Sequence, residues 1–273
     1  MDIIHLPFEL WTLIFDLLNI KVQVRLIQLC KTIKDKIFIT NLCRIDYKFK
    51  IKLTGAIIKK INHMKHMASN LRKLNAGGDS WIDDDSLVGL NLIVLYADNN
   101  PNIKKINHMT NLGKLDASGN CGIGDAGLVG LNLVELHVCD NPKIKKINHM
   151  TNLRILDASG NCGIGDEDIV GLNLIKLDAY DNPKIKKINH MINLRILNAS
   201  KNSGIGDDGI IGLNLVELNA AYNPKIKKIN HMTNLRILNA SFNSGIEDED
   251  LVGLNLVKLH AYKNPKIKNK TLP

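Results

Sequence analysis

The chain has 273 residues, of which 45% are hydrophobic and 23% charged, so it can bury a sizeable core and is not a disordered chain. Its net charge of +9 is uneven, because residues 1–67 carry +7 and the remaining residues only +2. The larger part of the chain therefore lacks the excess of Lys and Arg that a duplex-binding surface needs.

The amino-terminal segment has helical periodicity. Apolar residues recur at helical spacing between Leu10 and Leu29, and Pro7 stands at a first-turn position. Its charges and proline make it too polar for a signal peptide or a membrane span. We expect a small helical domain over residues 1–46. Alternating apolar and charged residues from Arg44 to Leu53, followed by IKKINHM at residues 58–64, then predict a capping strand and a half-coil over residues 47–70.

A tandem repeat fills residues 71–273. The segment that begins at Ile147 returns nearly unchanged at Ile188 and Ile229, a period of 41 residues. Within each period the pattern L-x-x-L-x-A-x-x-N occurs twice, which predicts ten coils with lengths that alternate between 21 and 20 residues. The coils begin at Leu71, Leu92, Leu112, Leu133, Leu153, Leu174, Leu194, Leu215, Leu235 and Leu256.

The recurring positions of the repeat have predicted structural roles. Leu at the first and fourth positions and Ala at the sixth should point into a narrow core, with Val138 as the one replacement for Ala. The ninth position is Asn in nine of the ten coils, and we expect these amides to form a buried ladder that bonds the backbone of each bend. Pro142 and its copies exclude a long helix from the shorter coils. Asp166 is predicted to cap one helical turn that buries Ile169 and Leu172.

The repeat resembles the leucine-rich-repeat family, with Ala where the third Leu usually stands. The resemblance implies an α/β solenoid, a leucine-rich-repeat horseshoe with a parallel β-sheet on its concave face. The stretch SGNCGIGDAGL at residues 118–128 is similar to repeats of F-box leucine-rich-repeat proteins. The tandem copies in an Ile, Lys and Asn-rich chain also resemble repeat proteins of giant DNA viruses of the mimivirus kind.

The amino-terminal segment resembles an F-box. The likeness rests on Leu6, Pro7, Glu9, Leu10, Ile14, Phe15 and Leu18, followed by Val24, Arg25, Leu29, Cys30 and Lys31. It implies docking on the Skp-type adaptor of a cullin-RING ubiquitin ligase, with the repeats presenting a protein substrate. The adaptor-binding residues would be Leu6, Pro7, Leu10, Ile14, Phe15, Leu18 and Leu29. A simple helical cap on the first coil, in a repeat scaffold with no ligase link, is the alternative.

Sequence variation points to the concave side of the solenoid. Positions five, seven and eight of each coil should project there, and at these positions the copies differ. Only 4% of the chain is aromatic, so rings on successive coils suggest a contact surface, although ordinary drift among the copies would also produce them. The predicted substrate-binding residues are Asp98, Asp116, Asp140, Asp157, Asp178, Tyr180, Asp181, Tyr222, Phe242 and Tyr262. Their charge favours a partner with a basic segment.

Other candidate sites are explained better by structure. His108 and its copies recur every 41 residues, two coils apart, which places them about 10 Å from one another and too far for a shared zinc ion. The KIKK runs are interpreted as a solvated outer face rather than a nucleic-acid or membrane stripe. We expect no metal, no cofactor and no enzymatic activity. The acidic concave face also disfavours RNA. Five unpaired-looking cysteines favour a reducing compartment, so a cytoplasmic protein is predicted, in the host cytoplasm if the source is viral.

Overall fold

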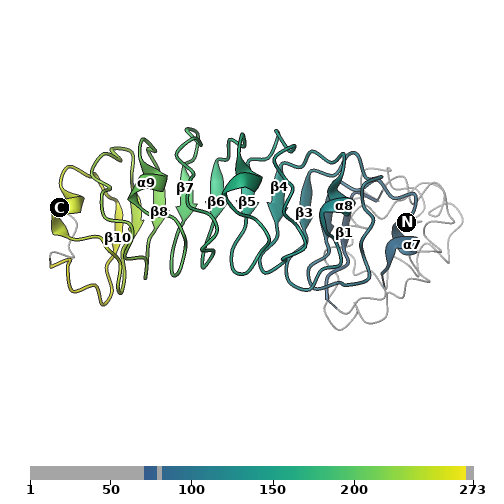
Figure 1. Ribbon diagram of the computed structural model, residues 1–273, viewed down its shortest axis with the longest axis horizontal. Coiled ribbons are helices and arrows are strands. Elements are labelled where there is room, and N and C mark those ends of the chain that lie inside the picture. The colour runs from purple at the N-terminus through teal and green to yellow at the C-terminus, as the bar shows by residue number, and fades with distance from the viewer. Residues whose placement is uncertain (1–70, 79–81, 269–273) are drawn as a thin grey trace, which may run out of the picture. The chain divides into compact units, whose positions relative to one another are not determined.

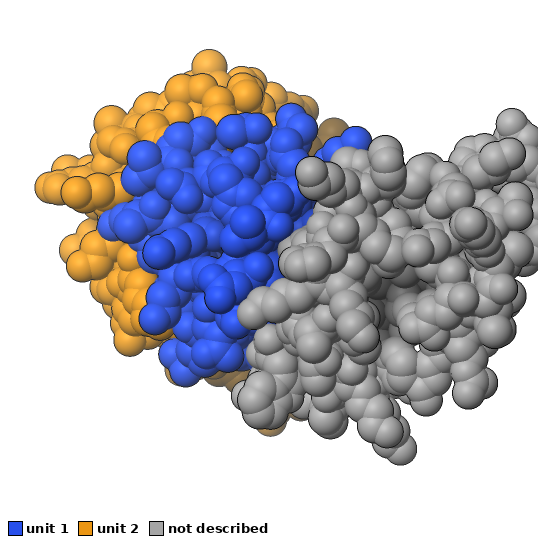
Figure 2. Space-filling model, turned by 90° about the vertical axis from the view of Figure 1, so that its right-hand side faces the viewer, with its two compact units in different colours: residues 1–116, 120–131 blue, residues 117–119, 132–273 orange. Residues whose placement is uncertain are grey.

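The computed structural model describes residues 71–78 and 82–268. The predicted helical domain over residues 1–46 and the capping segment over residues 47–70 lie outside the described residues, together with all seven predicted adaptor-binding residues. The chain divides into two compact units, which are coloured in Figure 2. Unit 1 comprises residues 1–116 and 120–131, and unit 2 comprises residues 117–119 and 132–273.

Each coil contributes one three-residue strand, and consecutive strands within a unit pair in parallel, as Figure 1 shows. Unit 1 contains β1 (Lys73–Asn75), β2 (Val94–Tyr96) and β3 (Lys114–Asp116). Unit 2 contains β4 (Glu135–His137), β5 (Ile155–Asp157), β6 (Lys176–Asp178), β7 (Ile196–Asn198), β8 (Glu217–Asn219), β9 (Ile237–Asn239) and β10 (Lys258–His260). The repeat letters stay in register across the pairs, because Leu156 stands opposite both Leu136 and Leu177.

The predicted core letters are confirmed. The central Leu of every strand from β1 to β9 is buried, while the residues on either side of it lie on the outer face of the sheet. Ala at the sixth position and its replacement Val138 are fully buried, and so are the return-side residues Ile144 and Ile147. Burial of one Leu side chain contributes roughly 1.5–3 kcal/mol, so the repeated pattern supplies most of the apolar stabilisation of each coil.

The predicted Asn ladder is present in only half of the coils. In the 20-residue coils the ninth-position Asn is buried: Asn182 Nδ2 donates to the Ala158 carbonyl at 2.7 Å and to the Ile164 carbonyl at 3.2 Å. In the four 21-residue coils whose ninth residue is described, that residue, such as Asn161, is exposed. There the tenth residue takes the inner place, because the longer loop carries one more residue. The tenth residues are Cys121, Cys162, Ser203 and Ser244, and all four are buried.

The 21-residue coils return through a single helical turn. The turns are α7 (Asp84–Leu87) and α8 (Asp125–Leu128) in unit 1, and η2 (Asp166–Ile169), α9 (Asp207–Ile210) and η3 (Asp248–Leu251) in unit 2. Burial of Ile169 and Leu172 is confirmed. The predicted capping role of Asp166 is wrong, because Gly165 is the N-cap residue and Asp166 Oδ1 instead accepts hydrogen bonds from the Lys186 and Lys187 backbone N–H groups of the next coil.

The third residue of these turns correlates with their geometry. It is Gly or Ser in the α-helical turns and Asp in the two 3-10 turns. A side chain on Gly209 would collide with the Lys186 carbonyl oxygen, so glycine allows α9 to lie against the neighbouring return segment. In η2 the equivalent Asp168 accepts a hydrogen bond from the Gly165 backbone N–H at 2.9 Å. The size of the third residue thus determines how closely each turn approaches the return segment of the adjacent coil.

Candidate functional site

The candidate site is the outer face of the strands and the loop that follows each strand, which we call the strand face. It carries positions three, five, seven and eight of each coil. In unit 1 it presents the predicted residues Asp98 and Asp116, both half-buried. In unit 2 it presents the other eight, of which Asp140, Tyr222 and Tyr262 are exposed and Asp157, Asp178, Tyr180, Asp181 and Phe242 are half-buried.

Position five has a structural task that the sequence did not reveal. Its side-chain oxygen accepts a hydrogen bond from the backbone N–H two residues later, at 3.0 Å from Ser159 to Asp157 and at 2.9 Å from Tyr180 to Asp178. Asn performs the same task in later coils, since Asn219 accepts from the Ala221 N–H at 3.2 Å. The exchange of Asp for Asn at this position therefore keeps the turn and changes only the charge.

The two central aspartates differ in their electrostatic surroundings. Burial acts to raise the pKa of Asp157, but the adjacent His137 imidazole and two hydrogen bonds from Ser159 outweigh it and lower that pKa below its ordinary value. His137 Nδ1 lies 3.7 Å from Asp157 Oδ2, and His137 Nε2 lies 2.7 Å from Glu135 Oε1. At Asp178 burial prevails and raises the pKa despite hydrogen bonds from Tyr180 and Asn198. Asp157 is thus the better stabilised anion.

Three aromatic residues on successive coils form a continuous cluster, which we call the ring cluster: Tyr222, Phe242 and Tyr262. The first two rings are stacked, with centroids 4.1 Å apart and planes 13° apart. Phe242 and Tyr262 meet edge to face, with centroids 5.5 Å apart. Tyr222 is 45% exposed and Tyr262 62% exposed, so the cluster presents aromatic surface to solvent.

The backbone beneath two of these rings is strained. Position eight adopts a left-handed conformation in the loop after each strand, with φ of 59° at Tyr222 and 61° at Phe242. Gly119 and Gly160 occupy the same position with φ of 64°, which shows that the loop needs no side chain there. A bulky residue in this conformation costs about 1–3 kcal/mol, and such strain is concentrated at functional sites.

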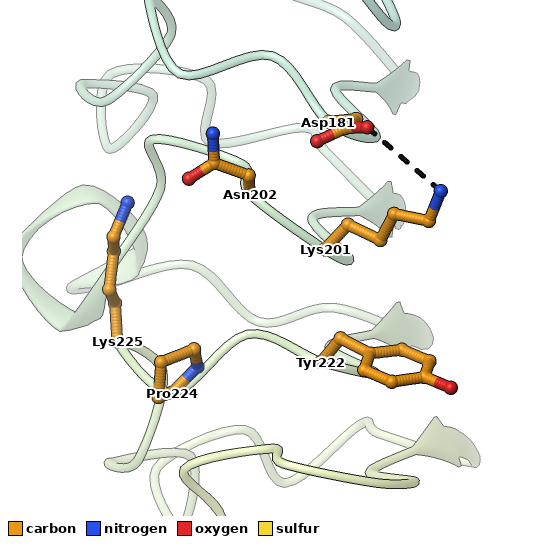
Figure 3. Close-up of a pocket in the computed structure, with 6 residues that line it drawn as sticks. All are labelled: Asp181, Lys201, Asn202, Tyr222, Pro224 and Lys225. Atoms are coloured by element: carbon orange, nitrogen blue, oxygen red, sulfur yellow. Dashed lines mark ion pairs between the residues drawn. The ribbon is translucent and has the colours of Figure 1, made fainter.

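A shallow hollow of about 420 Å³ borders the ring cluster. Its lining residues are drawn in Figure 3 and come from three successive loops: Asp181, Lys201, Asn202, Tyr222, Pro224 and Lys225. Lys201 Nζ lies 3.9 Å from Asp181 Oδ2 and 4.6 Å from the Tyr180 ring centroid. Phe242, on the following coil, covers one side of Tyr222, so the opposite side of that ring faces the hollow.

Sequence reasoning missed several residues of the strand face. Lys201 stands at position eight, and Tyr96 and His137 stand at position five, so the repeat numbering places all three on this face. Selection by acidic character and by rings on the later coils does not include a lysine, a histidine or a ring on an early coil. The positional rule alone would have found them.

The lysine runs lie on other parts of the coils. Lys186 and Lys187 are exposed, and their backbone N–H groups lie 2.6 and 2.8 Å from Asp166 Oδ1 of the preceding coil. The Lys184 ammonium donates to the Cys162 carbonyl at 2.7 Å. Acidic helical turns therefore alternate with lysine segments along unit 2. A continuous positive stripe is absent from these segments, which favours the predicted solvated face.

The repeated histidines and cysteines also have structural partners. His190 Nε2 lies 3.2 Å from the Ile169 carbonyl oxygen at the end of η2. Burial raises the pKa of Cys162 to about 11, so its thiol stays protonated at neutral pH. In residues 71–78 and 82–268 no group of three His, Cys, Asp or Glu side chains is arranged to hold a metal ion. The helices of the same ranges are too short or too polar to cross a membrane.

Comparisons with known proteins give one family match and a weak structural likeness. A family model described as Leucine Rich repeat matches residues 149–172. The chain is also similar in structure to a chain in the crystal structure of the yeast Rad7 and Elc1 complex, with 15% identity, a TM-score of 0.41, and coverage of 84% of this chain and 86% of that one. No curated protein matches the sequence. The parallel strands, their register, the buried leucine pattern and the family match identify the described region as a leucine-rich-repeat solenoid.

Proposed function

We propose that the chain is a protein-binding module and that its strand face holds the partner. The observation that carries this proposal is the ring cluster, because exposed aromatic side chains on a strained backbone contribute nothing that the fold requires. The leucine-rich-repeat match at residues 149–172 supports the same class of function. In this proposal the chain catalyses no reaction itself.

The partner carries a basic segment. Five carboxylates lie on the strand face of β4 to β6, at Glu135, Asp140, Asp157, Asp178 and Asp181. Their field should accelerate encounter with a basic segment, and this effect should weaken with added salt, since the Debye length is about 8 Å at physiological ionic strength. The aromatic contacts should supply the part of the affinity that salt leaves unchanged.

The finer role is that of substrate-recognition subunit of a Skp-cullin-F-box ligase, acting in the cytoplasm. This part rests on the F-box resemblance of residues 1–46, which lie outside the described residues. Leu6, Pro7 and Leu10 would bury against the adaptor, and each such apolar contact contributes a few kcal/mol. The strand face would then present the substrate to the ligase.

Calorimetry of the full chain with a Skp-type adaptor tests this role. The wild-type chain should bind, and simultaneous replacement of Leu6, Pro7 and Leu10 by Ala should abolish binding while the repeats keep their circular dichroism spectrum. Replacement of the exposed Lys143, Lys145 and Lys146 by Ala is the matched triple control and should leave adaptor binding unchanged. Absence of wild-type binding would remove the ligase role and leave a repeat scaffold that binds proteins.

A further inference from the structure

The strand face of unit 2 is chemically divided. The coils of β4 to β6 carry the five carboxylates named above, together with Lys176, whereas the coils of β8 to β10 carry the ring cluster with Glu217, Lys258 and Lys263. Lys201 and the hollow beside Tyr222 lie between these two parts. A partner that contacts both parts therefore lies on a negative surface over β4 to β6 and on an aromatic surface over β8 to β10.

The hollow is suited to one anchoring side chain. Tyr222 offers an aromatic face, its ring points away from Pro224, and Lys201 on the preceding loop places a cation at the rim (Figure 3). A planar aromatic side chain can stack on Tyr222 and receive the Lys201 ammonium on its own face. The ion pair between Lys201 and Asp181 is long at 3.9 Å and exposed, so it holds Lys201 weakly, and a partner ring would compete with the Tyr180 ring for the Lys201 ammonium.

The carboxylates keep acceptor capacity toward solvent. Asp157 Oδ1 accepts from the Ser159 backbone and hydroxyl, while its Oδ2 lies 3.7 Å from His137, outside hydrogen-bond distance. Asp140 is exposed and Asp181 half-buried, each on a loop after its strand. Lysine or arginine side chains of a partner can therefore reach several of these groups at once.

The repeat spacing sets the distance between the two kinds of contact. Neighbouring parallel strands lie about 4.8 Å apart, so the centre of the Asp157 and Asp178 pair is two coils, or about 10 Å, from the hollow between the β7 and β8 loops. An extended peptide spans about 3.3 Å per residue, so three residues bridge that distance. Both sites then bind one chain segment without distortion.

We propose that the strand face recognises an extended peptide segment in which a basic cluster is separated by about three residues from an aromatic anchor that enters the hollow beside Tyr222. This inference rests on the proposed protein-binding function of the strand face. It specifies the partner by the order and spacing of its chemistry along the solenoid axis, rather than by net charge alone.

Fluorescence anisotropy with synthetic peptides and the full chain tests the spacing. Each peptide joins three Lys or Arg residues to one Trp through zero, three or nine prolines, in both block orders, because a polyproline spacer is stiff and rises about 3.1 Å per residue. In one of the orders the three-proline peptide should bind at least tenfold more tightly than either block alone, through the raised effective concentration of the second block. The zero-proline and nine-proline peptides should lose this gain.

Variants assign the two contacts. Tyr222→Ala should remove the gain contributed by Trp, and Asp157→Asn with Asp178→Asn should remove the gain contributed by the basic block. Lys186→Ala with Lys187→Ala is the control and should change neither. Binding of separate blocks without a gain at any spacer would overturn the bipartite segment and leave strand-face binding intact. Lack of binding by every peptide, or loss of binding in the lysine control alone, would also overturn it.

Discussion

Asn182 is buried between two coils of unit 2, where its amide satisfies backbone groups that water does not reach. Its Nδ2 bonds the Ala158 and Ile164 carbonyls, and its Oδ1 accepts from the Lys184 N–H at 2.9 Å. Asn161 has the same place in the repeat pattern but lies in a longer coil and is exposed, while buried Cys162 stands at the inner site. Comparison of the same substitution at the two asparagines therefore measures how much the buried amide ladder contributes to stability.

We expect Asn182→Leu to destabilise the chain strongly. The substitution keeps the side-chain size but removes the bonds to the Ile164 carbonyl and the Lys184 N–H, and it leaves the Ala158 carbonyl with only the Cys162 thiol, at about 1–3 kcal/mol for each buried group that loses its partner. Asn161→Leu should change the unfolding free energy by less than about 0.5 kcal/mol, as surface substitutions usually do. Urea denaturation followed by circular dichroism measures both, and equal losses in the two variants would contradict the alternating ladder.

Asp157 and Asp178 are neighbours in register but should respond in opposite ways to charge removal. The lowered pKa of Asp157 means that its charge stabilises the fold above the unfolded pKa near 3.9, and this stability is lost as pH falls through the folded pKa. The raised pKa of Asp178 means the reverse: its charge costs stability once pH rises through the folded pKa.

We therefore expect Asp157→Asn to lower the unfolding free energy at pH 7, and Asp178→Asn to leave it unchanged or raise it slightly. The gap between the variants should begin to narrow as pH falls below the unfolded pKa near 3.9, and it should keep narrowing until pH falls through the lower pKa of the folded Asp157. Denaturant titrations at pH 7 and pH 3.5 measure the change in unfolding free energy that each substitution causes. A greater loss from Asp178→Asn at pH 7 would mean that the hydrogen bonds around Asp157 do not stabilise its anion.

At the scale of the element, the return turns are shaped by one small residue. Gly209 lets α9 approach the Lys186 carbonyl, whereas Asp168 in η2 bonds back to the Gly165 N–H and the turn becomes a 3-10 helix. In both turns an aspartate at the first position, Asp207 or Asp166, accepts two backbone N–H groups of the next coil. These contacts join neighbouring coils outside the apolar core.

Gly209→Ala should destabilise unit 2. The new methyl group meets the Lys186 carbonyl, which cannot move without shifting the return segment of the preceding coil, and overpacking of this kind costs about 1–3 kcal/mol. The adjacent Asp208→Ala is the control, because Asp208 is exposed and a helix tolerates alanine well. Thermal unfolding compares them. A melting temperature for Gly209→Ala at or above that of the control would show that the turn has room for a side chain.

The sequence predicted the elements better than their details, for physical reasons. Leucine spacing determines which side of a coil is buried, so the strands, the core and their register followed from the repeat. The pattern did not reveal that Asn161 faces solvent, because one extra residue in the loop moves Cys162 inward without disturbing the leucines. Nor did the pattern reveal the left-handed backbone at Tyr222, since a tyrosine does not itself indicate a positive φ.

At the scale of the whole molecule, the lysine segments and the strand face have different roles. The lysine segments alternate with acidic turns, and hydrogen bonds from their backbone N–H groups and ammonium groups join neighbouring coils. The strand face of unit 2 instead presents five carboxylates on the coils of β4 to β6 and the ring cluster on the coils of β8 to β10. This contrast predicts that binding is lost by changes on the strand face and not by changes in the lysine segments.

Selection of a random peptide library on the immobilised full chain tests this claim most directly. The enriched peptides should bind Tyr222→Ala with Phe242→Ala at least tenfold more weakly than wild type, which is about 1.4 kcal/mol and modest for an aromatic anchor. They should bind Lys186→Ala with Lys187→Ala as tightly as wild type. Loss of binding in the lysine variant with full binding in the aromatic variant, or a library that yields no binding peptide, would contradict the strand face as the protein-binding surface.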